Sequence, residues 1–384
     1  MKSVLCVVNH SSAGGAQELW VNIAEGFKAR GYDVALVALY PLSAQATQTN
    51  RAPDDLPWTY ITKQRPTAIA AQLRMLQSLV SFLRQRNADF AFTAMPAANV
   101  LVPLAARLAG CQTKVVTSHH GPVSTYNSLL NFVDGPIGTI KSVHRVISVS
   151  NTVFRSLDKK PKSYREKCVV IHNALPPEIE RLTANLAEGR VGRKAGRLVV
   201  ATGRLSAQKN YHVLLRAAAS LPDVQIRIVG GGEDEKPLKE YAEKLGVTGR
   251  VDFLGFRPRA EALSLLAEGD VFVQPSLYEG HSLALVEAAK LGLPMVVSNV
   301  PVQMESITAS DGTVCGIGVD PHDDKALAEA ILGLLNGGNA NYQNYAARSR
   351  QLASEYRFDL MMDEYEALMR KTDGPSGRSL AANF

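Results

Sequence analysis

Short apolar runs rich in Val, Ile and Leu alternate along the chain with longer segments in which apolar residues recur at helical spacing. In the first half, this pattern predicts strands at residues 4–8, 34–39, 89–93, 114–117, 145–149 and 169–171. It predicts helices at residues 16–30 and 67–86. Strands that alternate with helices are typical of a mostly parallel sheet covered on both faces.

The alternation restarts after a polar segment at residues 176–196, which we interpret as a linker. Strands are predicted at residues 198–202, 224–229, 251–254, 271–273, 295–298 and 314–319, and helices at residues 211–220, 235–245, 259–266 and 324–335. The fold class is therefore α/β, with two Rossmann-like doubly wound domains, at residues 1–175 and 197–352. Ligands of such sheets bind at the carboxyl ends of the strands, so a site is expected in a cleft between the two domains.

One stretch, Glu279 to Glu287, lies where a strand leads into a helix predicted at residues 282–291. The helix start offers unpaired backbone amides to a phosphate. At about 1.5 Å of rise per residue, Ser282 and Glu287 lie roughly 7.5 Å apart along the helix axis, which is comparable to the distance from a diphosphate to its ribose. Glu287 is then placed for ribose hydroxyls and Glu279 for a sugar hydroxyl. The alternative is a pair of solvated carboxylates. The predicted donor-binding residues here are Glu279, Gly280, His281, Ser282, Leu283 and Glu287.

A second loop, from Gly203 to Asn210, also joins a predicted strand to a helix. The planar guanidinium of Arg204 can grip a diphosphate, and the ammonium of Lys209 adds a second positive charge. Such a pair neutralises a leaving diphosphate without a metal ion, and no Asp-x-Asp follows a strand. We therefore expect no metal site and no cofactor. The alternative is a solvated loop with two surface cations.

Glycines at two further loops would let a ligand approach the backbone closely. Gly14 and Gly15 open the first helix, and Gly231 lies in a run of three glycines after residues 224–229. A simple tight turn is the competing explanation in both places. The first loop is not a dinucleotide fingerprint, because the third glycine of that motif is absent.

Two histidines end a strand of the first domain, where they face the predicted cleft. Adjacent residues in an extended segment point to opposite sides, so one of His119 and His120 is expected to be structural, and His119 is favoured as the one that faces the acceptor. Ser150 and Asn173 close the next two strands and either line the acceptor side or cap a helix or turn. Ordinary loop histidines are the alternative for the pair.

Composition and charge indicate which classes of ligand or partner the protein binds. The 384 residues hold 42 Lys and Arg against 36 Asp and Glu, a net charge of +6, which favours phosphate-bearing ligands or an anionic membrane surface. Basic segments at residues 158–162 and 165–167 are candidates for such a contact, although a solvated face explains them as well. No signature of nucleic-acid binding is present. The apolar runs are too short to span a bilayer.

The four cysteines are widely separated, which favours free thiols in a reducing cytoplasm over disulfides or a metal site. We therefore expect a cytoplasmic protein. A peripheral location at the inner face of the membrane is compatible with this expectation.

Taken together, these motifs resemble the retaining glycosyltransferases of family 4, which have the GT-B fold. The residues that carry the resemblance are Gly14, Gly15, His119, Asn173, Gly203, Arg204, Lys209, Gly230, Gly232 and the Glu-x7-Glu pair of Glu279 and Glu287. It implies a nucleotide diphosphate sugar in the second domain, an acceptor hydroxyl in the first, and transfer of a hexose with retention. It also implies that residues 353–372 form a helix crossing back to the first domain, ahead of a tail at 373–384.

On this resemblance, the catalytic candidates are His119, Arg204, Lys209 and Glu279, and UDP-sugar is the default donor. The acceptor would be a saccharide, glycolipid or small metabolite. Two other functions remain open from the sequence: a nucleotide-sugar epimerase of the same fold, and a nucleotide-sugar-binding protein without activity.

Overall fold

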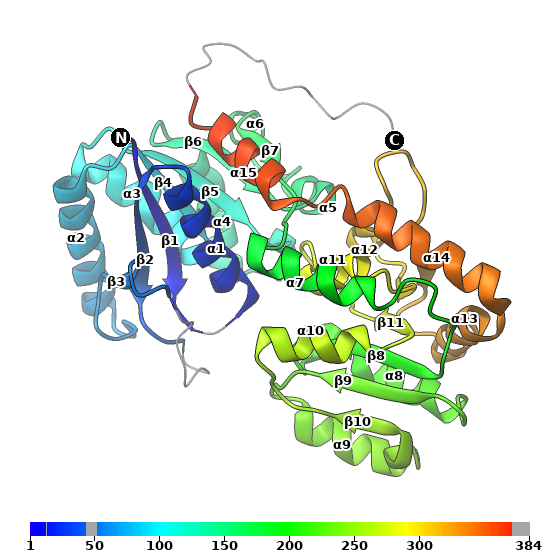
Figure 1. Ribbon diagram of the computed structural model, residues 1–384. Coiled ribbons are helices and arrows are strands. Elements are labelled where there is room, and N and C mark those ends of the chain that lie inside the picture. Colours follow the sequence, from blue (N-terminus) through cyan, green and yellow to red (C-terminus); the bar gives the residue numbers. More distant parts are fainter. Residues whose placement is uncertain (13, 44–51, 371–384) are drawn as a thin grey trace.

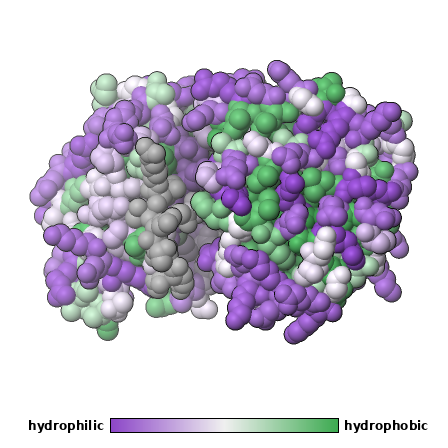
Figure 2. All heavy atoms as spheres, turned by 60° about the horizontal axis from the view of Figure 1, so that its bottom comes forward, coloured by the Kyte–Doolittle hydropathy of each residue, from purple (hydrophilic) through white to green (hydrophobic). Residues whose placement is uncertain are grey.

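The computed structural model describes residues 1–12, 14–43 and 52–370. Two α/β domains lie side by side, and the C-terminal helix returns to the first domain (Figure 1). On the face shown in Figure 2, hydrophilic side chains cover most of the surface and apolar ones gather on the second domain. The predicted tail at 373–384 lies outside the described residues.

The first domain is built on a parallel sheet with the strand order β3-β2-β1-β4-β5-β6-β7. Its strands are β1 (Ser3–His10), β2 (Asp33–Tyr40), β3 (Trp58–Tyr60), β4 (Phe90–Ala94), β5 (Lys114–His119), β6 (Val143–Ser148) and β7 (Cys168–Val170). Six of these match the predicted strands. The edge strand β3 was not predicted, because its three residues are half-buried or exposed and carry no apolar alternation.

Helices cover both faces of this sheet (Figure 1). They are α1 (Gly15–Ala29), α2 (Ile69–Arg86), α3 (Pro96–Ala109), α4 (Ser128–Thr139), α5 (Asn151–Arg155) and α6 (Lys162–Arg165). The C-terminal helix α15 (Phe358–Ala367) packs on α1, where a Cβ on Gly26 would lie 2.9 Å from the Met362 sulfur. The absence of a side chain at Gly26 therefore lets α15 approach α1 closely.

The second domain repeats the architecture with the strand order β10-β9-β8-β11-β12-β13, again all parallel. Its strands are β8 (Leu198–Thr202), β9 (Gln225–Val229), β10 (Val251–Phe253), β11 (Val271–Gln274), β12 (Met295–Ser298) and β13 (Ile317–Val319). Its helices are α8 (Tyr211–Ala219), α9 (Glu235–Lys244), α10 (Arg259–Ala267), α11 (Leu283–Lys290), α12 (Pro301–Ser306), α13 (Asp324–Asn336) and α14 (Gly338–Ala353).

The segment at residues 176–196 is more than a linker. It contains a helix, α7 (Pro177–Glu188), that packs against α10 and α11 of the second domain. Arg190, at the end of α7, is buried and donates to the carbonyl oxygens of Leu291 (2.9 Å) and Gly269 (2.7 Å). Because these carbonyls satisfy the buried guanidinium, the segment is fixed to the second domain.

Glu305 of α12 joins the two domains. Its carboxylate accepts hydrogen bonds from the backbone amides of Asn151 (2.6 Å) and Thr152 (2.8 Å), at the start of α5, and lies 3.3 Å from His172 Nε2. Burial raises the pKa of Glu305, but the His172 contact and the two amides outweigh it and lower the pKa to about 2. The carboxylate therefore stays ionised and holds the first domain at all but strongly acidic pH.

The four cysteines are free thiols, as predicted. Within the described ranges, no helix combines the length and apolar character needed to cross a membrane.

Candidate functional site

The carboxyl ends of strands from both sheets meet at a cavity of about 230 Å³ between the domains. It is lined by Met95, Pro96, His120, Gly121, Thr125 and Tyr126 from the first domain and by Gln208, Tyr278, Glu279 and Gly280 from the second. A cavity therefore lies where the sequence predicted a site, and both domains contribute residues to it.

Lys209 and Glu279, which the sequence placed in separate loops, are in direct contact. The ammonium nitrogen of Lys209 lies 2.7 Å from Glu279 Oε1, and both side chains are largely buried. Gln208 Nε2 donates to the Tyr278 carbonyl (2.9 Å), so the loop after β8 is tied to the loop after β11. The ion pair therefore joins Lys209 to Glu279, which lines the cavity.

Glycines allow these loops to pack. A Cβ on Gly203, whose φ is +145°, would lie 2.9 Å from Lys209 Cε, and one on Gly230 would lie 2.0 Å from the Gly203 carbonyl oxygen. A Cβ on Gly231 would meet its nearest neighbour, the Phe256 amide nitrogen, at 3.5 Å. The glycine run after β9 is therefore required chiefly by close backbone packing against the loop that carries Lys209.

Arg204 lies apart from this pair. Its guanidinium Nε is 2.9 Å from Glu233 Oε2, and its side chain is 64% exposed. The two predicted diphosphate cations, Arg204 and Lys209, therefore have different partners and very different solvent exposure.

Glu287 lies on α11 with its side chain 12% exposed, and Arg259 Nη2 lies 2.6 Å from its Oε1. Burial raises the pKa of Glu287, and the Arg259 guanidinium opposes that rise. Arg259 also pairs with Glu18 of α1 across the domain boundary. The sequence analysis did not identify Arg259 or Glu18, because neither follows a strand or belongs to a recognisable motif.

The start of α11 is held by a buried polar network. The Ser282 hydroxyl donates to Gln274 Oε1 (2.7 Å), so it is engaged within the protein, while α11 itself begins at Leu283. Asn173 Nδ2 donates to the His281 carbonyl oxygen (3.1 Å). Asn173, predicted on the acceptor side, thus contacts the backbone of the loop that carries the predicted donor residues.

The ring of His281 lies among other rings, with its centroid 4.8 Å from that of Tyr356 and 5.1 Å from that of His172. Burial and the neighbouring His172 lower the pKa of His281 to about 3, so the ring is neutral. Its two nitrogens have no hydrogen-bond partner within the described part of the chain.

The two adjacent histidines differ from the expectation that His119 faces the acceptor. His119 Nε2 lies 2.7 Å from the Tyr164 hydroxyl, which in turn donates to Asp134 Oδ2 (3.0 Å), and its ring is 1% exposed. His120, not His119, is the histidine that lines the cavity. The physical reason is that the buried Tyr164 and Asp134 hold His119 inside the first domain.

The other predicted residues lie at helix starts. The Ser150 hydroxyl accepts from the Val153 amide (3.1 Å) and caps α5, the alternative that the sequence left open. Gly14 and Gly15 precede and begin α1, which places the α1 amides at the carboxyl end of β1; residue 13 of this loop lies outside the described residues.

Within the described residues, no group of three His, Cys, Asp or Glu side chains is arranged to hold a metal ion.

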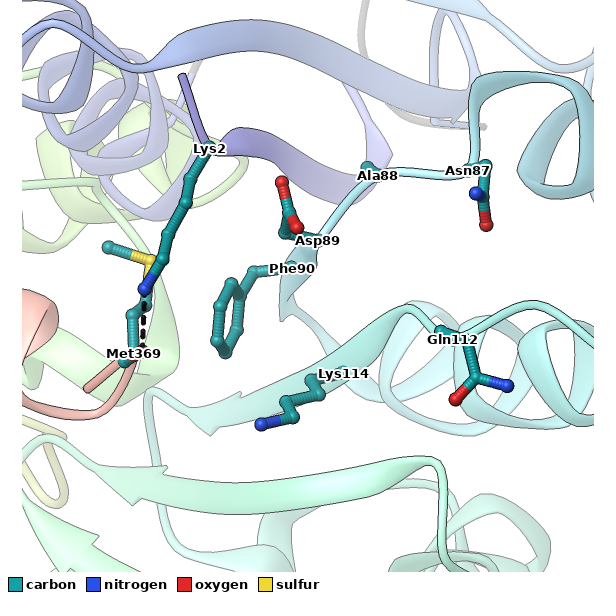
Figure 3. A pocket seen from close by; sticks show the side chains of 8 residues that line it. All are labelled: Lys2, Asn87, Ala88, Asp89, Phe90, Gln112, Lys114 and Met369. Atoms are coloured by element: carbon teal, nitrogen blue, oxygen red, sulfur yellow. Dashed lines mark hydrogen bonds between the residues drawn. The ribbon is translucent and has the colours of Figure 1, made fainter. Parts of the chain in front are cut away.

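A larger cavity, of about 310 Å³, lies at the other end of the first sheet, near the amino ends of the strands β1, β4 and β5 (Figure 3). The ammonium nitrogens of Lys2 and Lys114 lie 5.8 and 5.7 Å from the centroid of the Phe90 ring. Lys2 also donates to the Met369 carbonyl (3.0 Å). No predicted site residue lines this cavity, so the interdomain cavity is the candidate site.

Two family models match complementary parts of the chain. The model described as Glycosyltransferase Family 4 matches residues 13–179, and the model described as Glycosyl transferases group 1 matches residues 189–351. They meet at α7, near the junction of the two domains, and together they include both sheets.

Similar proteins carry related descriptions. An uncharacterized glycosyltransferase of Haemophilus influenzae is 22% identical over 379 residues, covering 94% of this chain and 98% of its own. The UDP-Gal:alpha-D-GlcNAc-diphosphoundecaprenol alpha-1,3-galactosyltransferase of Escherichia coli is 31% identical over 252 residues, covering 62% of this chain and 64% of its own.

Solved structures agree with the fold. Anabaena Alr3699/HepE, crystallised with UDP and with UDP-glucose, superposes with a TM-score of 0.75 at 20% identity, covering 96% of this chain and 98% of its own. At this identity, the likeness supports the architecture of two facing Rossmann-like domains. The two family models, with the Escherichia coli relative, show that the chain belongs to the family 4-type glycosyltransferases of the GT-B fold.

Proposed function

We propose that this glycosyltransferase moves a hexose-type sugar from a UDP-sugar to an acceptor hydroxyl, with retention of configuration and without a metal ion. The observation that carries the proposal is the contact of Lys209 with Glu279 at the wall of the interdomain cavity. A UDP donor is further supported by the UDP complexes of the similar Anabaena protein and by the UDP-Gal transferase of Escherichia coli.

Different residues contact the diphosphate, the hexose and the ribose of the donor. Lys209 and Arg204 take the diphosphate, for which Lys209 leaves Glu279 and Arg204 leaves Glu233. Glu279 then accepts from a hexose hydroxyl, and Glu287 accepts from the ribose. The amides at the start of α11 add partial positive charge close to the diphosphate.

In the transfer step, the acceptor oxygen bonds to the anomeric carbon from the face that the diphosphate leaves. The bond between that carbon and the phosphate oxygen breaks, and this oxygen takes the proton of the acceptor. The protein supplies positioning and stabilisation of the negative charge that develops on the leaving diphosphate. Glu279 and Glu287 are binding groups here and not an acid/base pair.

Donor binding tests the proposal. In calorimetry with EDTA present, we expect UDP-glucose or UDP-galactose to bind, and GDP- and ADP-sugars at the same concentration to bind far more weakly. Donor at 100 times its Kd should stabilise the chain by about 2.7 kcal/mol in thermal unfolding. A strict requirement for a divalent metal contradicts the roles given to Lys209 and Arg204.

Product analysis separates the competing functions. With an acceptor present, proton NMR should show a glycoside with the anomeric configuration of the donor. An inverted product contradicts retention. Epimerised donor formed without acceptor favours an epimerase, and binding without any turnover favours a protein that only holds the nucleotide sugar.

We further propose that the acceptor is presented at an anionic lipid surface. Two apolar side chains of α4, Leu129 and Phe132, are 69% and 77% exposed, and α4 follows directly after the cavity-lining residues Thr125 and Tyr126. The basic segment after α5 lies against this helix, since Lys160 Nζ is 2.7 Å from Asn131 Oδ1. Exposed apolar residues beside basic ones suit a membrane interface with anionic lipids.

Vesicle binding tests the lipid contact. The Leu129→Ser/Phe132→Ser variant should lose about tenfold or more in partitioning to vesicles of phosphatidylglycerol and phosphatidylcholine, because full burial of each such side chain is worth about 1.5–3 kcal/mol. Val191→Ser, which replaces a side chain that is 74% exposed in the second domain, is the matched control. Equal partitioning of both variants, or equal binding to vesicles of phosphatidylcholine alone, contradicts the proposal.

A further inference from the structure

Arg259 forms a contact that links the predicted ribose site to the first domain. It begins α10, its side chain is 19% exposed, and its Nη2 lies 2.6 Å from Glu287 Oε1. Its Nη1 bonds to Glu18, in the first turn of α1. A single guanidinium therefore lies between two carboxylates from different domains.

One nitrogen of this guanidinium, Nε, is buried and has no hydrogen-bond partner in the described part of the chain. Nη2, on the same edge, is also buried, and Glu287 Oε1 lies 2.6 Å from it as its ion-pair partner. Because a buried donor without an acceptor is costly, Nε is suited to an oxygen of a ligand, and Nη2 beside it can donate to a second one.

The surroundings indicate which oxygens these are. Glu287 is the carboxylate proposed for the ribose hydroxyls, and the phosphate attached to that ribose lies within a few bonds of them. The start of α1 is in the same place, because Glu18 is only three residues after Gly15, or roughly 4.5 Å along the helix axis. Helix amides and a guanidinium edge together make a site for a phosphate.

We infer that Arg259 is a donor-binding residue, which holds two oxygens of the phosphate next to the ribose while Glu287 accepts from the ribose hydroxyls. This inference rests on the proposed function, because it takes the ligand to be a nucleotide sugar. It divides the diphosphate between two groups of cations: Arg259 at the ribose end, and Lys209 with Arg204 at the sugar end.

The inference also predicts how the charge of Glu18 affects nucleotide binding. Its carboxylate pairs with Arg259, so a phosphate held by Arg259 would lie close to a negative charge. Removing its charge should therefore leave nucleotide binding unchanged or tighten it. If the Arg259 contacts served only to hold the two domains together, loss of Glu18 and loss of Arg259 would weaken binding in the same direction.

Calorimetry with UDP, UMP and uridine tests the inference. Arg259→Gln should weaken UDP and UMP by about tenfold to a hundredfold, as expected for loss of a charge-assisted bidentate contact, and should change uridine binding little. Arg259→Lys should recover part of the loss, and Glu18→Gln should bind UDP at least as tightly as the native chain. Arg257→Gln, which lies two residues before Arg259 and pairs with Glu261 at 3.4 Å, is the matched control.

The outcomes are distinct. If the native chain binds UDP and Arg259→Gln binds it equally well, the inference fails while the proposed function stands. Equal losses for uridine and UMP, or an equal loss in Glu18→Gln, assign Arg259 to the domain contact and also overturn the inference. If the native chain binds none of the three compounds, the proposed function fails with it.

Discussion

Replacing Lys209 with methionine is expected to lower kcat/KM for sugar transfer by about 10²–10³, the effect of removing one preorganised group that stabilises charge in a transition state. The expected cause is loss of the ammonium that meets the leaving diphosphate. Methionine keeps a comparable length of apolar chain against Gly203, whose absent side chain makes room for Lys209. Steady-state transfer from UDP-glucose, measured with excess EDTA, gives the result.

The Lys209→Met variant also leaves Glu279 without its partner, so stability has to be measured separately from catalysis. The Glu279 side chain is only 9% exposed, and an unpaired buried charge is destabilising. The double variant Lys209→Met/Glu279→Gln should recover the unfolding temperature without recovering transfer. Lys236→Met, which removes an ammonium whose side chain is 88% exposed on α9, is the control. Full activity in Lys209→Met contradicts the proposed role.

Most strands of both sheets could be predicted from the sequence because the central strands, such as β4, β11 and β12, are buried on both faces. Such strands are short β-branched runs bounded by turns, as in β8 and β12, whose bounds match the prediction. The helix α3 was missed because its sequence is apolar nearly throughout, so apolar residues do not recur at a helical spacing that marks one face. It also contains Pro103, which is unusual inside a helix. The helix α7 was missed because its polar composition resembles that of a linker.

Within the site, the sequence predicted the residues that belong to loops at the carboxyl ends of strands. Gly203, Lys209, Glu279 and Gly280 could be placed together because each loop ends a strand of one sheet. Contacts between the domains could not be predicted in this way. Neither the pairing of Arg259 with Glu18 nor the engagement of His119 by Tyr164 has a local pattern, because each depends on how distant elements pack.

Gly280 is a point at which the two domains pack closely against each other. A Cβ added to this residue would lie 2.0 Å from the His120 carbonyl oxygen and 3.2 Å from the Gly121 amide nitrogen, both in the first domain. Gly280 is not among the residues with positive φ, so alanine is compatible with its backbone conformation. The clash is therefore with the facing domain, and relief requires the loop or the whole domain to move.

We expect Gly280→Ala to lower transfer by at least about a hundredfold, because a displacement of about 1 Å at the reacting groups is enough for such a loss. UDP binding should weaken much less, since Lys209, Arg204 and Glu287 all belong to the second domain. Gly249→Ala is the matched control, because its Cβ would meet nothing within 4 Å. Calorimetry with UDP and steady-state transfer separate the two effects. Near-native transfer in Gly280→Ala would mean that catalysis does not use this approach of the domains, whereas loss of transfer with retained UDP binding assigns the defect to their alignment.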